Sequence, residues 1–342
     1  MIKIDGSYLE GGGQILRTAT ALSVITQLPC HIFNIRQTRP KPGLATQHLL
    51  GLQALAQFCS GRLEGDELGS TEIKFYPGSH CQNSISIKIP TAGSITLILQ
   101  SLILPALLSN QTVRISFEGG ATDTFFSPPF DYFQFVFLKI LEKMGGQVEV
   151  NLRRRGYYPT GGAQIEVKTW PIAEKQLGPL NLTKRGELKR ILILSGAAES
   201  LKEKKVAERQ ISGVKEILGK LKLPLEEKIE YYKTDCPGSQ INLIAEFENT
   251  IMGVNNLGKL GKKAETVGKE AALELLKEEK SGACLDKYSA DQILPYLPLT
   301  KNKSSITVSE ITSHCQTNIW VVEKFFKGKF QIENNLITWL AD

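Results

Sequence analysis

An internal repeat organises most of this 342-residue chain. Residues 1–90 predict a strand, a glycine-rich turn, a helix, a strand, a second helix and further strands, and residues 84–169 predict the same order. Strands show apolar residues at every second position and helices at every third or fourth, and this change of period recurs after roughly 90 residues. The chain therefore predicts an α+β fold of three repeated units, each with two helices on a four-stranded sheet.

The first two copies are defined by their apolar runs. The first copy predicts strands in IKIDGS and CHIFNIRQ, helices in GQILRTATALSVITQ and ATQHLLGLQALAQFCS, and strands up to about Tyr76. The second predicts strands in SISIKIP, TVRISFEGG, QVEVNLRRR and AQIEVKTW, and helices in SITLILQSLILPALL and FDYFQFVFLKILEKMGG.

The third copy is interrupted. We expect it to begin with the strand LKRILILSG, residues 188–196, and to resume near residue 288 with SADQILPYLPL, SSITVSEI, NIWVVEKFF and KFQIENNLITWL. The segment between contains two charged amphipathic helices and YYKTDCPGSQINLIAEFE, which predicts a hairpin-like pair of strands. We predict an inserted α/β domain over 184–280 and a core domain formed by 1–183 and 281–342.

Charge and composition restrict the class of protein only loosely. The net charge of +6 suits an anionic ligand such as a nucleotide or RNA, although many proteins that bind neither are equally basic. The most apolar window, residues 95–108, contains Gln100 and Pro105 and is too short to span a bilayer, so we expect a buried helix and no membrane contact. MIKIDGSYLE lacks the apolar core of a secretory signal, and the six cysteines have no disulfide-motif or zinc spacing, which favours reduced thiols and a cytoplasmic location.

Two stretches in the first copy have the composition of a phosphate site. EGGGQILRTA, residues 10–19, places three glycines before a helix, where the backbone and the helix start can approach an anion; Glu10 and Arg17 flank them. IRQTRPKPGL, residues 35–44, holds Arg36, Arg39 and Lys41 beside two prolines. Each stretch also has a plainer interpretation, a tight turn and a basic surface loop.

The second copy contributes two aromatic loops. GGATDTFFSPPF is rich in aromatic residues and proline, and RRRGYYPTGG combines three arginines with two tyrosines, a mix that suits phosphate contact and base stacking. The alternative for the second loop is the basic end of a hairpin.

His314 is one of only four histidines and lies between SSITVSEI and NIWVVEKFF. Thr312 and Ser313 can cap the helix that follows, and the positive end of the helix dipole would favour a neutral, nucleophilic imidazole and attract a phosphate. Such a histidine can form a covalent intermediate, but a lone histidine is more often structural.

Six of these stretches together resemble the RNA 3′-terminal phosphate cyclases. They are DGSYLEGGGQILRTA, IRQTRPKPGL followed by TQHL, AGSITLILQ, RRRGYYPTGGA, KYSADQ and TSHCQTNIWVVEKF, in the family's order from residue 5 to 325. The resemblance implies three units like the C-terminal domain of a translation initiation factor, with a small inserted domain. It also implies the conversion of an RNA 3′-phosphate to a 2′,3′-cyclic phosphate at the expense of ATP.

The resemblance assigns roles to individual residues. His314 corresponds to the nucleophile that takes AMP from ATP before AMP passes to the RNA 3′-phosphate, giving an RNA(3′)pp(5′)A intermediate. Glu10 corresponds to a carboxylate near the ATP phosphates that helps to hold a divalent metal, Mg²⁺ or Mn²⁺. The remaining implied residues bind ATP or AMP (Arg17, Gln100, Pro128 or Pro129, Tyr288, Asp291 and Gln292) or a phosphate of ATP or RNA (Arg36, Arg39, Gln47 and His48).

Two other functions compete with a cyclase. Cyclase-like proteins that act in ribosome assembly share the fold but lack the catalytic histidine, whereas this chain has His314 together with Glu10 and Tyr288. From the residues alone, a basic RNA-binding protein is the other possibility. The sequence leaves open the physiological RNA, DNA or 5′-end activity, the preferred metal, the role of the insert and whether the protein is a monomer or a homodimer.

Overall fold

The computed structural model describes residues 1–341, and its strands form four four-stranded sheets. The first unit contains β1 (Ile2–Asp5), α1 (Gln14–Thr26), β2 (Cys30–Phe33), α2 (Thr46–Cys59), β3 (Arg62–Glu64) and β4 (Ile73–Tyr76). The second unit contains β5 (Ser84–Ser94), α3 (Ile95–Leu107), β6 (Val113–Ala121), a second helix, β7 (Val148–Arg154) and β8 (Gln164–Thr169). That second helix consists of α4 (Phe130–Tyr132), the π-helical η1 (Phe133–Phe137) and α5 (Leu138–Lys143).

The third unit is assembled from two distant parts of the chain. It contains β9 (Asn181–Leu182), α8 (Lys287–Ile293), the 3₁₀ helix η4 (Leu294–Leu299), β14 (Ser304–Thr307), α9 (Ser313–Phe325), β15 (Gly328–Glu333) and β16 (Leu336–Ala341). In all three units the first strand pairs in parallel with the second, and the last two strands add in antiparallel orientation. This shared pairing confirms the predicted α+β fold of repeated units.

The prediction for the first strand of the third unit was wrong. LKRILILSG forms part of β10 (Leu188–Ala198), which belongs to the fourth sheet, and the two-residue β9 pairs with β14 instead. A buried strand has the same apolar run in whichever sheet it lies, so the sequence pattern could not assign the sheet.

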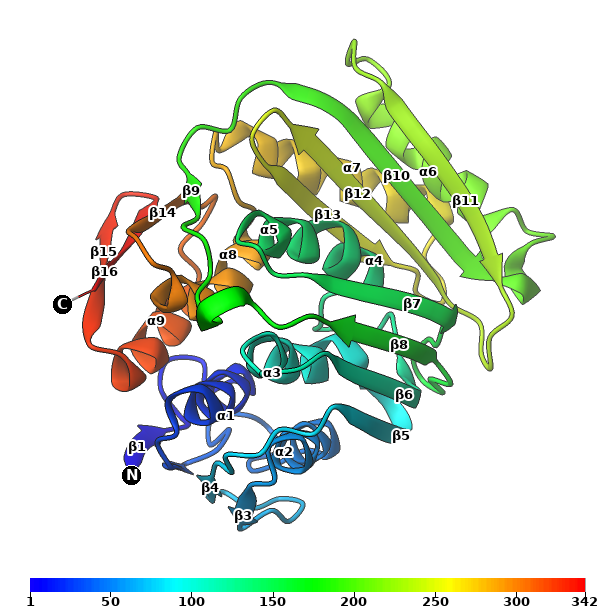
Figure 1. Cartoon of the computed structure of the whole chain (residues 1–342). Helices are drawn as coiled ribbons and strands as arrows, with labels where there is room; N and C mark the ends of the chain where they lie inside the picture. Colours follow the sequence, from blue (N-terminus) through cyan, green and yellow to red (C-terminus); the bar gives the residue numbers. More distant parts are fainter. Residues whose placement is uncertain (342) are drawn as a thin grey trace.

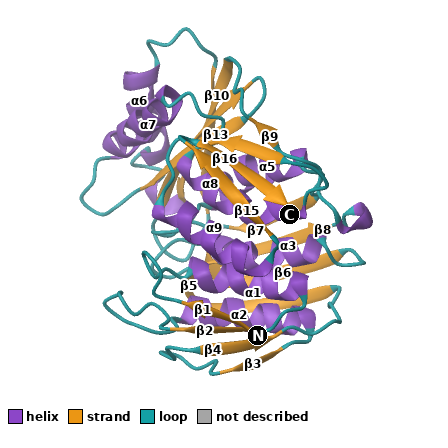
Figure 2. Cartoon of the chain, turned by 90° about the vertical axis from the view of Figure 1, so that its left-hand side faces the viewer, coloured by secondary structure: helices purple, strands orange, loops and turns teal. Residues whose placement is uncertain are grey.

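The fourth sheet is formed by the segment between β9 and α8. It contains β10, α6 (Val206–Leu218), β11 (Leu225–Tyr232), β12 (Ser239–Phe247), β13 (Ile251–Leu257) and α7 (Ala264–Lys280), with a short 3₁₀ turn at Glu199–Leu201 after β10. Another short 3₁₀ turn, Ala173–Lys175, lies outside this segment, before β9. The strand order is β11-β10-β12-β13, so β11 and β12 both pair with β10 and do not form the expected hairpin. Helices α6 and α7 lie side by side, away from the helices of the other units (Figure 2).

Two groups of buried apolar side chains hold the molecule together. The larger extends through all three units, where α1 packs against both α3 and α9, and the smaller lies between the fourth sheet and helices α6 and α7. Figure 1 shows the sheet of the second unit in the middle of the molecule, with the fourth sheet beyond it and β1 and the C-terminal strands on the opposite side. Within residues 1–341, no helix combines the length and apolar character needed to cross a bilayer.

Candidate active site

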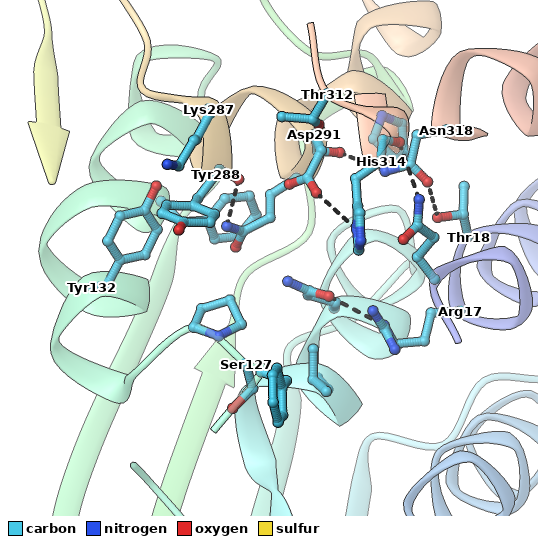
Figure 3. Close-up of a pocket in the computed structure, with 18 of the residues that line it drawn as sticks. Arg17, Thr18, Ser127, Tyr132, Lys287, Tyr288, Asp291, Thr312, His314 and Asn318 are labelled. Atoms are coloured by element: carbon cyan, nitrogen blue, oxygen red, sulfur yellow. Dashed lines mark hydrogen bonds and ion pairs between the residues drawn. The ribbon is translucent and has the colours of Figure 1, made fainter. Parts of the chain in front are cut away.

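A pocket of about 660 Å³ lies where helices of all three units meet. Its walls come from α1, α3, α8, α9 and the loop before α4, and Asn255 of β13 adds one residue from the fourth sheet. Tyr288 and Tyr132 lie at one end, and Arg17 and His314 lie at the other (Figure 3). The pocket brings together eight of the residues singled out in the sequence: Glu10, Arg17, Gln100, Pro128, Tyr288, Asp291, Gln292 and His314.

His314 stands in the first turn of α9 and is flanked by two carboxylates. The hydroxyl of Thr312 caps the helix by accepting a hydrogen bond from the Cys315 amide at 3.1 Å. The His314 Nε2 lies 2.8 Å from Glu10 Oε2, and its Nδ1 lies 3.5 Å from Asp291 Oδ2. The imidazole is therefore held between residues that precede it by more than 300 positions and by 23 positions in the chain.

The electrostatic expectation for His314 was wrong in sign. The hydrogen bond that the Asp291 carboxylate accepts from the ring is the largest influence, and together with the charges of Asp291 and Glu10 it raises the pKa of His314. The helix start carries only a partial positive charge, and two carboxylates in contact with the ring outweigh it.

A second set of hydrogen bonds joins α1, α8 and α9 near His314. Gln14 Nε2 donates to the His314 carbonyl at 3.1 Å, and Thr18 donates to Asn318 Oδ1 at 2.9 Å. Asn318 Nδ2 in turn donates to the backbone carbonyl of Asp291 at 2.8 Å. The sequence analysis missed these three side chains, although their four-residue spacing places Gln14 with Thr18, and His314 with Asn318, on one face of each helix.

The segment that carries Glu10 is also attached to α9. The ring of Tyr8 stacks on Trp320 with centroids 4.2 Å apart and an interplanar angle of 10°. Arg39 Nη2 lies 3.6 Å from Glu10 Oε2, the same oxygen that His314 contacts. The stacking contact and this ion pair both help to hold the Glu10 carboxylate beside the imidazole.

Arg17 forms a fixed cationic centre in the pocket. Its Nε donates to Gln100 Oε1 at 3.2 Å, which joins α1 to α3. Desolvation lowers the pKa of Arg17 to about 10, so the guanidinium remains protonated at neutral pH. Arg17 and the Gln100 amide can therefore serve a phosphate group placed near His314.

The opposite end of the pocket offers flat surfaces. Tyr288 is 45% exposed, and Tyr132 meets its ring edge-on at a centroid distance of 6.5 Å. Asp286 caps α8 by accepting from the amides of Tyr288 and Ser289, each at 2.9 Å. Pro128 lines the pocket, whereas Pro129 is buried at the start of α4.

Four predicted phosphate-site residues lie outside this pocket. Arg36 donates to the Gly43 carbonyl at 2.8 Å within its own loop, and Arg39 borders the pocket only through Glu10. Gln47 and His48 lie at the start of α2 and line a small neighbouring cavity, to which Arg17 also belongs. Arg17 therefore lines both the large pocket and this small cavity.

His48 is buried in close contact with the glycine-rich turn. Its Nδ1 accepts a hydrogen bond from the Ala45 amide at 3.2 Å, which completes a capping arrangement for α2. A Cβ added at Gly13 would lie 2.2 Å from His48 Nε2, so this position requires glycine. Burial, reinforced by the charges of Arg17 and Arg36, lowers the pKa of His48 to about 3.

Two residues of RRRGYY, Arg155 and Tyr157, are buried and take part in the packing of the fold. Arg155 is buried and bonds Asp123 at 3.0 Å and Asp131, and Tyr157 is buried with its hydroxyl on Gln240. Tyr158 is the tyrosine that remains exposed.

A sequence model of the RNA 3′-terminal phosphate cyclase family matches residues 8–332. The chain belongs to this family. Proteins named RNA 3′-terminal phosphate cyclase are similar over nearly the whole chain: that of Pyrococcus furiosus is 45% identical over 98% of this chain and 96% of its own length. Those of Thermococcus kodakarensis and Methanopyrus kandleri are 44% and 41% identical, over 98% and 97% of this chain and 95% of their own lengths.

In this member of the RNA 3′-terminal phosphate cyclase family, Glu10 is the residue expected to hold a divalent metal. Within residues 1–341, no cluster of three or more histidine, cysteine or acidic side chains is arranged to hold a metal ion. Mg²⁺ at nucleotide sites is commonly bound through one or two carboxylates together with substrate phosphates and water. The single carboxylate of Glu10, open to the pocket, fits that kind of donor set.

Proposed function

We propose that this chain uses ATP to convert an RNA 3′-terminal phosphate to a 2′,3′-cyclic phosphate. The observation that carries the proposal is His314, held between Glu10 and Asp291 at 2.8 and 3.5 Å in a pocket that also contains Arg17 and a tyrosine–proline pair. Family membership over residues 8–332 supports the same activity.

The first step that we propose is transfer of AMP to His314. The lone pair of Nε2 attacks the α-phosphorus of ATP, a nitrogen–phosphorus bond forms, and the bond to the bridging oxygen breaks to release pyrophosphate. Asp291 accepts the hydrogen bond from Nδ1–H and so leaves the lone pair on Nε2. Glu10, 2.8 Å from Nε2, is placed to accept the proton that this nitrogen must lose.

In the next two steps AMP passes from His314 to the RNA, and the RNA end then closes into a ring. An oxygen of the RNA 3′-phosphate attacks the phosphorus of the bound AMP and displaces the imidazole, which gives RNA(3′)pp(5′)A. The neighbouring 2′-hydroxyl then attacks the 3′-phosphorus, closes the ring and expels AMP. The first transfer is needed because a phosphate monoester is a poor electrophile until it carries a good leaving group.

We assign the other residues by their position. Tyr288 and Pro128 would hold the adenine from two sides, Gln292 would support Tyr288 through its 2.7 Å hydrogen bond to the Tyr288 carbonyl, and Arg17 with Gln100 would hold the α-phosphate. Arg36, Arg39, Gln47 and His48, beyond Arg17, would receive the RNA 3′-phosphate. Glu10 would hold a divalent metal, Mg²⁺ or Mn²⁺, which when bound would neutralise phosphate charge.

We also propose that residues 184–280 form an inserted domain and that 1–183 and 281–342 form the core. The separate apolar core of the fourth sheet supports this division. A cytoplasmic location is part of the proposal, supported by Cys30, Cys59, Cys284 and Cys315, which are buried as free thiols.

The experiment that tests the function is incubation with α-labelled ATP and magnesium without RNA, followed by denaturing electrophoresis. We expect an acid-labile, alkali-stable label that is absent in His314→Ala and retained in His80→Ala, the replacement of an exposed histidine. Addition of RNA with a 3′-phosphate should then yield the cyclic phosphate. RNA binding without label or conversion would refute the proposal and indicate a non-catalytic, cyclase-like protein.

A further inference from the structure

An exposed aromatic surface borders the pocket. It consists of Phe125 and Phe126 in the loop between β6 and α4, Tyr158 in the turn between β7 and β8, and Lys259 between β13 and α7. Phe126 is fully exposed at 102%, and Tyr158 is 57% exposed. Large aromatic side chains presented together to solvent are typical of binding surfaces.

Three members of this aromatic surface, Phe125, Tyr158 and Lys259, contact one another although they come from three segments. The rings of Phe125 and Tyr158 meet edge-on with centroids 6.1 Å apart. The Lys259 ammonium lies 5.0 Å from the centroid of the Phe125 ring. Residues of the second unit and of the fourth sheet therefore form one continuous surface of rings and positive charge.

The loop that presents Phe126 is held at both ends. Thr122 donates to the Gly156 carbonyl at 3.0 Å, and Thr96 donates to the Pro128 carbonyl at 2.6 Å. Between these anchors Phe126 has φ of +62°, a conformation that bulky residues rarely adopt. The loop thus keeps a fully exposed phenylalanine in a disfavoured backbone conformation, which is typical of functional positions.

The position of the aromatic surface favours a polynucleotide over a single nucleotide. Phe126 lines the pocket, but Phe125, Tyr158 and Lys259 lie outside it, so one nucleotide in the pocket cannot use them. A strand that continues from the pocket can place successive bases on the rings and a phosphate near the ammonium. Lys259 is exposed, and its ammonium lies over the Phe125 ring, where a phosphate of the same strand can reach it.

We propose that the aromatic surface binds the single-stranded RNA that precedes the 3′-terminal phosphate. Bases stack on Phe126 and Tyr158, and Lys259 contacts the backbone. The inference rests on the proposed function in one respect, namely that the RNA 3′-phosphate reaches the AMP on His314 at the edge of the pocket. It adds a requirement for unpaired nucleotides upstream of that end.

The test measures binding of a fluorescent oligoribonucleotide of about ten nucleotides with a 3′-phosphate to the full chain. We expect Tyr158→Ala with Lys259→Ala to weaken binding on the order of tenfold, since each stacked base contributes a factor of about 5 to 150. Lys259→Ala alone should reduce the slope of log affinity against log salt by about 0.7. Phe126→Leu, which keeps the apolar bulk without the ring, should weaken binding as Phe126→Ala does.

The controls show whether a loss of RNA affinity arises at the aromatic surface, at the nucleotide site or from misfolding. Lys88→Ala, on the outer face of β5, should leave RNA affinity unchanged, and the Tyr158/Lys259 variant should keep wild-type labelling by ATP without RNA. A single-stranded probe of about three nucleotides should bind the variant and the wild type with similar affinity, because it is too short to reach the aromatic surface. A duplex as long as the main probe should also show little difference in affinity.

Unchanged affinity for the single-stranded probe in the Tyr158/Lys259 variant would overturn the inference, and so would an equal loss for the short and duplex probes. If the wild type fails to take label but the variant still loses single-strand affinity, the cyclase proposal fails and the aromatic surface stands.

Discussion

The carboxylate of Asp291 lies 3.5 Å from Nδ1 of His314, and in the proposed mechanism it keeps a proton on that nitrogen. In Asp291→Asn the amide can present NH₂ to the ring and favour the wrong tautomer, so we expect adenylylation to slow by about 100-fold, the cost typical of a misplaced reacting group. Pre-steady-state labelling with α-labelled ATP measures this rate. Asp66→Asn, in a loop of the first unit, is the matched control, and an unchanged rate in Asp291→Asn would contradict the assigned role.

Because His48 is buried, we expect the free energy of unfolding to decrease at acidic pH. Its pKa is about 3 in the folded chain, against an ordinary value near 6.5 in the unfolded chain. Between these values the unfolded chain binds a proton that the folded chain does not, so the free energy of unfolding falls as the pH falls below 6.5. At pH 5 the loss relative to pH 7.5 is about 2 kcal/mol.

Urea unfolding of the wild type and of His48→Gln at the two pH values measures this contribution. Glutamine can keep the capping hydrogen bond to the Ala45 amide but does not titrate. The variant should therefore lose about 2 kcal/mol less than the wild type between pH 7.5 and pH 5. Equal losses would show that His48 is not the source.

At the residue scale, resemblance to a known family identified more of the site residues than composition and spacing did. The residues Glu10, Arg17, Gln100, Asp291 and His314 were expected to belong to one site, and they line one pocket. The direction of the His314 pKa shift could not be predicted, because it depends on carboxylates brought into contact by the fold.

Helix α9 begins at Ser313, directly before the proposed nucleophile His314, so we expect its cap to affect both stability and adenylylation. Removing the hydroxyl in Thr312→Ala should cost about 1 kcal/mol of stability and slow adenylylation, because the first turn carries His314. Thr312→Ser should restore both properties. Urea unfolding and labelling by ATP measure them, and a loss of stability with a wild-type rate would show that the imidazole does not depend on the cap.

At the element scale, the sequence predicted most helices and strands of the three units but assigned β10 to the wrong sheet. The two residues of β9 are too few to show a period, whereas the eleven residues of β10 show a strong one. The prediction therefore took the longer strand, β10, as the first strand of the third unit. Which strands pair is set by contacts between distant segments, as the shared partner of β11 and β12 also shows.

At the scale of the whole molecule, Arg155 links the second unit to the fourth sheet. It is buried with Asp123 and Asp131, while Asn242 of β12 donates to Asp131 at 3.0 Å and Tyr232 of β11 lies beneath the guanidinium at 4.6 Å. Arg155→Met leaves two buried carboxylates without their cation, so we expect a loss of about 3–5 kcal/mol.

Arg153→Met is the matched control, because Arg153 forms an exposed pair with Glu166 at 2.9 Å. Its loss should be no more than about 1 kcal/mol. Urea unfolding of both variants tests the difference, and equal losses would contradict the assignment of Arg155 as the link.

The interrupted third unit also has a consequence for protein synthesis. Ribosomes add roughly 5–20 residues per second, so β9 waits for about 6–25 s before its partner β14 is made. Glu10 precedes His314 by 304 residues, a delay of about 15–60 s. On the proposed function, a nascent chain therefore carries the glycine-rich turn and Arg17 long before His314 is available to take AMP. Covalent AMP on this protein would thus also report that translation has proceeded as far as α9.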